Sequence, residues 1–247
     1  MPILFLFLFL LTAILFPFFG KISIDILSWR YIILFSAMIA TAIIWNIYYY
    51  RGLQAEKVQE FELIVMFQPL LTILLATIFL KGERNIHIEI AAFIAAVCLI
   101  VAHINKNHLT LSRGATQLVL AVVFMSVELI IIDVLLKVLS PVALYTIRTG
   151  ILLIFFYLYM RPQISRVADS NIWLIFLTSA FGVAQMVSKF YGFEKYGVIY
   201  TSLILILAPI LIYIISSIWL HEKLKPRMII SALVIIGCIV YATILGK

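Results

Sequence analysis

The chain has 247 residues, of which 65% are hydrophobic and 12% are charged, and its mean hydropathy is +1.20. One soluble domain does not need this much apolar side chain to fill its core, so the composition excludes a soluble globular protein. The formal net charge of +7 comes from basic residues scattered at the ends of apolar runs, where they anchor helices at lipid headgroups, and this pattern argues against nucleic-acid binding.

Apolar runs of transmembrane length follow one another along almost the whole chain. A bilayer core of about 30 Å requires roughly 20 apolar residues per helix. The sequence predicts nine such spans, at 3–19, 29–50, 60–80, 87–104, 116–137, 141–160, 171–190, 198–220 and 228–245. The predicted fold class is therefore an all-α polytopic membrane protein. The polar breaks between spans are too short for a folded extramembrane domain, so we expect the function to reside within the membrane.

A segment of the first half recurs in the second half. Residues 66–83 read MFQPLLTILLATIFLKGE, and residues 207–223 read LAPILIYIISSIWLHEK. Pro209 follows Pro69 by 140 residues, and the same offset aligns further identical residues, namely Gly52 with Gly192, Leu71 with Leu211, Ala92 with Ala232 and Cys98 with Cys238. Such self-similarity indicates an internal repeat. Membrane proteins built from two related halves commonly bind a substrate between them, so the repeat favours a transporter.

The repeated segment resembles the EamA-like branch of the drug/metabolite transporter superfamily. The shared pattern is a proline within a span, an apolar run that closes near Glu83 or Glu222, and then a small-residue helix such as residues 231–240. Residues 140–148, SPVALYTIR, are also similar to the segment that opens a span in that family. The resemblance implies ten spans in two inverted five-helix repeats that carry small metabolites across a membrane.

On this pattern, residues 1–107 form the first repeat with four spans and residues 114–247 form the second with five. Relative to the family, the first span is missing from the first repeat. Either the full-length product has ten spans, or the chain is a nine-span member. The resemblance implies a cytoplasmic C-terminus and a multi-pass protein of the bacterial inner membrane. Lys and Arg are divided almost evenly between the two sides, so charge does not set the orientation.

Charged residues inside the predicted spans are the first candidates for a substrate site, because each costs at least about 2.5 kcal/mol on insertion scales. Glu128 lies near the middle of span 116–137, where it could bind a substrate or a proton. It could equally form a structural pair with Arg148 or Lys189. Arg148, inside span 141–160, could bind an acidic substrate group, hold a neighbouring carbonyl or reach the headgroups. These alternatives stay open at the level of sequence.

Two spans related by the repeat present polar or aromatic residues at equivalent positions. Subtraction of 140 maps Gln185 onto Trp45 and Lys189 onto Tyr49, and Asn46 lies beside Trp45. Spans 29–50 and 171–190 are therefore predicted to line a cavity with these side chains. Hydrogen bonding between helices by the two amides is the structural alternative.

Pro69 and Pro209 form a further symmetric pair of candidates. A proline within a helix removes a backbone hydrogen bond and bends the helix. Because the two prolines occupy equivalent positions, we expect matching kinks or hinges that shape the two halves of a cavity.

Together these features predict an integral membrane transporter that moves a small metabolite by alternating access between two repeats. The mixture of acid, base, amide and aromatic candidates suits a zwitterion such as an amino acid, and efflux is the expected direction. An intramembrane transferase enzyme and an inactive or accessory truncated transporter are the alternatives. No HExxH, GxSxG or glycine-rich phosphate loop is present in the sequence, so we expect no enzyme, catalytic residue, metal or cofactor. The expected partners are the lipid bilayer, a small-molecule substrate and a proton or ion gradient, with no nucleic acid, and the chain is a monomer or a homodimer.

The repeat also leads to an expectation about the full-length gene product. By symmetry with the second half, the natively expressed protein carries roughly 35 more residues at its start, comparable to the interval from Arg113 to Ile147. Intact-mass measurement of the natively expressed protein checks this expectation. A mass close to 28.1 kDa would contradict it.

Overall fold

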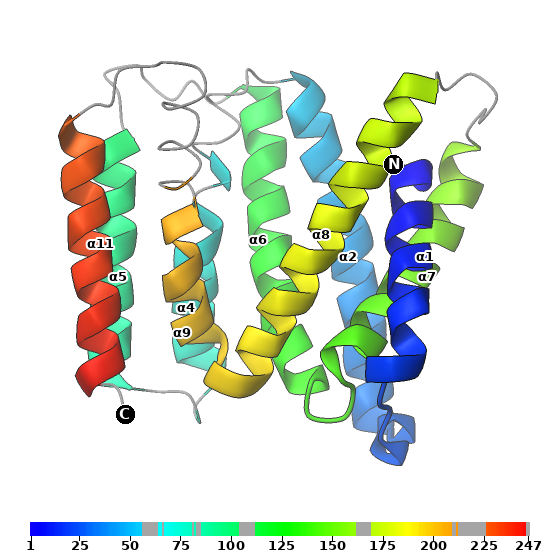
Figure 1. Cartoon of the computed structure of the whole chain (residues 1–247), viewed down its shortest axis with the longest axis horizontal. Coiled ribbons are helices and arrows are strands. Elements are labelled where there is room, and N and C mark those ends of the chain that lie inside the picture. The colour runs from blue at the N-terminus through cyan, green and yellow to red at the C-terminus, as the bar shows by residue number, and fades with distance from the viewer. Residues whose placement is uncertain are drawn as a thin grey trace. The chain divides into compact units, whose positions relative to one another are not determined.

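The computed structural model describes residues 1–55, 64, 65, 67–80, 82, 85–103, 112–161, 169–208, 211 and 226–245. The elements in this part of the chain are helices (Figure 1), in order α1 (Pro2–Phe19), the 3-10 helix η1 (Ile24–Leu27), α2 (Trp29–Ala55), α4 (Phe67–Phe79), α5 (Ile86–His103), α6 (Arg113–Leu135), α7 (Pro141–Met160), α8 (Asp169–Tyr196), α9 (Val198–Leu205) and α11 (Pro226–Leu245). Among the described residues, extended pairing is limited to one isolated bridge between Ile22 and Leu139.

The predicted all-α membrane fold is confirmed, and each predicted span coincides at least in part with a helix. Within the described ranges, five helical stretches are long and apolar enough to cross a membrane, namely Pro2–Phe19, Trp29–Ala55, Arg113–Leu135, Pro141–Met160 and Ile172–Tyr196. α8 continues to Tyr196, past the predicted end at residue 190. No proline lies in this stretch, and the helix ends before Gly197, which has a positive φ. Much of the predicted span 198–220 lies outside the described residues.

The chain divides into two compact units that differ from the predicted repeats. Unit 1 comprises residues 1–43 and 131–195, and unit 2 comprises residues 44–130 and 196–247. α2 and α6 each pass from one unit to the other along their length. Each unit therefore takes helices from both halves of the sequence, and the two sequence repeats stay a prediction.

In unit 1, α1 packs along α7 through aromatic rings and a glycine. The ring of Phe5 stacks on that of Phe156, with 5.3 Å between centroids. A Cβ atom on Gly150 would lie 3.0 Å from the ring of Phe9, so the glycine lets α1 approach closely. Small residues serve this purpose in membrane helices, where dispersion rather than the hydrophobic effect holds neighbours together.

Ser140 joins the end of α1 to the start of α7. Its hydroxyl donates to the carbonyl of Phe19 at 2.9 Å and accepts from the backbone N–H of Lys21 at 2.8 Å. The backbone N–H of Ser140 also donates to the carbonyl of Lys21 at 2.9 Å. As the N-cap of α7, the same hydroxyl accepts from the N–H of Ala143, and Pro141 follows at the first helical position. The Ser-Pro pair thus starts α7, and Ser140 fixes this start to the end of α1 and the residues that follow it.

In unit 2, α11 packs along α5, and α9 contacts α4, α5 and α11. Two side-chain hydrogen bonds connect these helices at one end. His87 Nδ1 and the Tyr241 hydroxyl are 2.9 Å apart, which joins α5 to α11. The hydroxyls of Tyr200 and Thr243 are 2.7 Å apart, which joins α9 to α11.

A second close approach in unit 2 brings α2 against α6. Gly52 faces Leu118, and a Cβ atom on the glycine would lie 2.4 Å from Leu118 Cγ. Leu118 is fully buried and belongs to an apolar cluster with Ile64, Ala115 and Val122. The side chain of Leu118 therefore has no space into which it could withdraw, and residue 52 must be glycine for this packing.

Gly52→Ala is expected to destabilise the protein by about 1–3 kcal/mol, because the added methyl group overpacks a filled contact. Thermal unfolding in detergent measures the effect. Gly237→Ala in α11 is the matched control, since nothing lies within 4 Å of its Cβ position, and it should leave stability unchanged or slightly raised. Equal behaviour of the two variants would contradict the packing described for α2 and α6.

Candidate functional site

A buried carboxylate and an indole face each other in unit 2. Glu128 on α6 is only 2% exposed, and the Trp45 indole Nε1–H on α2 donates to its Oε2 at 2.5 Å. α6 begins at Arg113, three residues before the predicted start of the span, so Glu128 lies about two-thirds of the way along the helix rather than near its middle. The hydrogen-bond donor, Trp45, is itself one of the candidates predicted from the sequence.

Two further candidates, Asn46 and Tyr49, lie near Trp45 on α2. Asn46 is 3% exposed. The Tyr49 ring meets the Trp45 ring edge-on, with 5.9 Å between centroids, and also packs against the apolar cluster that contains Leu118. Trp45 and Tyr49 are four residues apart and share a face of the helix. The structure therefore brings four of the candidate residues together in unit 2, counting Asn46 beside Trp45.

Ser126 is a buried polar residue of this region that sequence reasoning missed. It is fully buried, lies two residues before Glu128, and donates to the backbone carbonyl of Gln68 on α4 at 3.3 Å. The Thr72 hydroxyl donates to the same carbonyl at 2.8 Å. A lone hydroxyl in an otherwise apolar run was the available signal, since such a group needs an acceptor inside the protein.

Pro69 lies next to that carbonyl, in α4. The described part of this helix runs from Phe67 to Phe79, and the proline is its third residue. Pro209, the predicted counterpart, lies outside the described residues. The predicted pair of kinks stays a prediction.

In unit 1, Arg148 and Lys189 border one aromatic cluster formed by Tyr145, Phe190 and Phe193. Arg148 on α7 is 3% exposed, and its guanidinium carbon lies 6.0 Å from the centre of the Tyr145 ring. Tyr145 meets Phe190 edge-on at 5.8 Å, and Phe190 stacks on Phe193 at 6.4 Å. The Lys189 ammonium lies 5.7 Å from the centre of the Phe193 ring. Aromatic faces stabilise both cations at these distances.

Gln185 differs from the other candidates of α8 because its side chain is exposed. The aromatic residues beside Arg148 and Lys189 were not predicted, although their spacing of three or four residues along a helix was a readable signal. Among the described residues, no group of three or more His, Cys, Asp or Glu side chains could hold a metal ion. The charged candidates are thus Glu128 in unit 2, which is buried, and Arg148 and Lys189 in unit 1, which lie beside aromatic rings.

Comparison with known proteins identifies the fold and the family. A family model described as the EamA-like transporter family matches residues 112–244. A solved structure titled "Crystal structure of protein" aligns with 100% of this chain and 87% of its own, with a TM-score of 0.72 and 17% sequence identity, which shows a shared fold. In all, 24 chains of solved structures match. No curated protein matches the sequence.

Trp45→Phe is expected to lower the free energy of unfolding by about 1.5–3 kcal/mol, because it removes a donor from a buried carboxylate. Thermal unfolding in detergent measures this, and a cycle with Glu128→Gln separates the hydrogen bond from the lost ring area. Trp173→Phe, at an exposed tryptophan of α8, is the control and should have little effect. Additive effects of the two substitutions would rule out an energetic role for the hydrogen bond.

Proposed function

We propose a transport activity for this chain on the premise that it belongs to the EamA-like transporter family, whose model matches residues 112–244. It is a multi-pass membrane transporter of the drug/metabolite type. Our proposal is that it exports a small zwitterionic metabolite, such as an amino acid, across the bacterial inner membrane. Movement occurs by alternating access between the two repeats and draws on a proton or ion gradient.

The observation that carries this proposal is the burial of Glu128 against Trp45. A carboxylate removed from water is costly unless charged or hydrogen-bonding partners replace the solvent. A substrate ammonium group, which carries a positive charge and three donors, is the chemical complement of such a carboxylate. A proton is the other cation that it can accept.

Two of the cationic candidates, Arg148 and Lys189, lie in unit 1. Arg148 and Lys189 each lie at an aromatic face. A substrate carboxylate is the complement of these groups. The candidates predicted from the sequence mix acid, base and amide side chains, and this composition supports a zwitterion over a purely cationic or purely anionic metabolite.

Glu128→Gln is expected to reduce transport at least tenfold, because the amide keeps the size of the side chain but loses the charge that binds an ammonium group or a proton. The measurement is counterflow of radiolabelled amino acids by the purified chain in liposomes, with and without a pH gradient. Gln185→Ala tests the exposed candidate of α8 in the same assay.

Glu194→Gln is the matched control, since it makes the same change at an exposed position near the end of α8 and should leave transport unchanged. Full transport by both Glu128→Gln and Gln185→Ala would refute the proposed site. Absence of counterflow across a broad panel of amino acids would refute the substrate class, whereas activity on another metabolite would leave the family assignment intact.

A further inference from the structure

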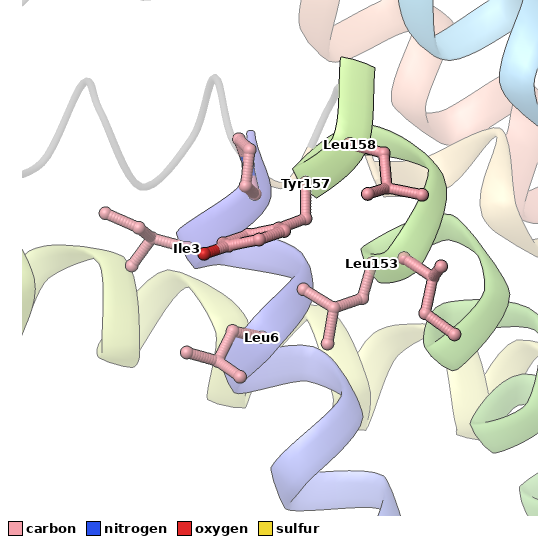
Figure 2. A pocket seen from close by; sticks show the side chains of 7 residues that line it. Ile3, Leu6, Leu153, Tyr157 and Leu158 are labelled. Carbon is pink, nitrogen blue, oxygen red and sulfur yellow. The ribbon is translucent and has the colours of Figure 1, made fainter. Parts of the chain in front are cut away.

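A groove lies between the start of α1 and the end of α7, entirely within unit 1. Its lining is apolar except for one hydroxyl and consists of Pro2, Ile3, Leu6, Leu153, Ile154, Tyr157 and Leu158. Figure 2 shows Tyr157 reaching from α7 toward Ile3 on α1, with its hydroxyl at the Ile3 side. The groove has a volume of about 310 Å³. At about 30 Å³ per water-sized group, it holds roughly ten such groups, which suits a stretch of hydrocarbon chain.

The outer wall of this groove faces outward from unit 1. Ile154 is 62% exposed and Leu158 is 67% exposed. Both belong to α7, which is long and apolar enough to cross a membrane. In a membrane-spanning segment such exposed apolar side chains contact acyl chains rather than water. The groove is therefore open to lipid along the last turns of α7.

A cation lies just beyond the groove, at the end of α7. Arg161 caps this helix, and its backbone N–H donates to the carbonyl of Tyr157 at 3.0 Å. It follows Leu158 by three residues, or about 4.5 Å of helical rise. Its side chain is exposed, and two tyrosines, Tyr157 and Tyr159, precede it on the same turn. Arginine and tyrosine together at the end of a span are typical of the headgroup region.

The backbone of Arg161 adds weight to this reading. Its φ of 44° and ψ of 60° are left-handed, and among the described residues it is the only non-glycine with a positive φ. Helix ends of this geometry favour glycine or asparagine, because a Cβ is crowded there. A glycine would end the helix here without crowding of a Cβ atom. The arginine side chain is therefore present at this position despite a backbone cost.

We propose that the groove and Arg161 form a binding site for an anionic phospholipid, with an acyl chain between α1 and α7 and the phosphate on the guanidinium group. Hydrocarbon gains little on moving from the bilayer into an apolar groove, so the acyl chain provides position rather than selectivity. Selectivity comes from the headgroup. An arginine binds phosphate strongly, and a headgroup without a cation of its own leaves that attraction unopposed.

Native mass spectrometry of the whole chain in mild detergent tests the proposal, with phosphatidylglycerol and phosphatidylcholine of matched acyl chains. The wild type should retain at least three times more phosphatidylglycerol than phosphatidylcholine. Arg161→Gln should bring the two lipids to equal retention. Leu153→Trp, which fills the groove, should lower the retention of both lipids, and its fold is checked by thermal unfolding.

Arg30→Gln is the matched control, because Arg30 is an exposed arginine at the other end of unit 1, beside Tyr31, and its loss should leave the lipid preference unchanged. Equal retention of the two lipids by the wild type would overturn the proposal, and so would a preference that survives Arg161→Gln. Loss of a dimer peak in Leu153→Trp, with lipid retention unchanged, would also overturn it and assign the groove to a second copy of the chain.

Discussion

The cost of burying charge in an apolar helical protein constrains the rest of this structure. Glu128, Arg148 and Asp133 are all buried within spanning helices, in a chain where most of the sequence serves only to cross the bilayer. Such groups persist only where partners replace water. The contact of Trp45 with Glu128 and the ring of Tyr145 beside Arg148 are two such replacements, one in each unit. The close approach of α2 and α6 at Gly52 lies in the same helix pair as the first contact, whereas the second is made within α7.

The fold was predictable because the bilayer imposes a length and a composition on each span. Runs such as 3–19 and 141–160 contain few polar residues, and their helices, α1 and α7, match the predicted bounds almost residue for residue. Pro141 after Ser140 is a helix-start signal that needs no tertiary knowledge. The predicted span began three residues after the start of α6. Arg113 and Gly114 are not apolar and were left out of the span, although both belong to the helix.

Polar residues in the spans were identifiable from the sequence, whereas their contacts were not. A charged or amide side chain in an apolar run is conspicuous, which is how Glu128, Arg148 and Asn46 were found. The donor that approaches Glu128 is set by the rotation and packing of α2 against α6. These depend on contacts such as that of Gly52 with Leu118, which the periodicity of the sequence does not predict. The spacing of aromatic residues such as Phe190 indicated a shared helix face but not their neighbours. Ser126, a lone hydroxyl in an apolar run, indicated a buried acceptor but did not identify it as the carbonyl of Gln68.

The directions of packed helix pairs bear on the predicted inverted repeat. Addition of 140 to the bounds of α1, 2–19, gives 142–159, close to Pro141–Met160 of α7, and the same addition to α5, 86–103, gives 226–243, close to Pro226–Leu245 of α11. These equivalent helices are also the ones that pack together, α1 with α7 and α5 with α11. Phe5 contacts Phe156 whereas Phe9 faces Gly150, so α1 and α7 run antiparallel. An inverted repeat requires equivalent helices to run in opposite directions, because a two-fold operation in the membrane plane reverses direction across the bilayer. The antiparallel pair of α1 and α7 satisfies this requirement within unit 1, and the repeat itself stays a prediction.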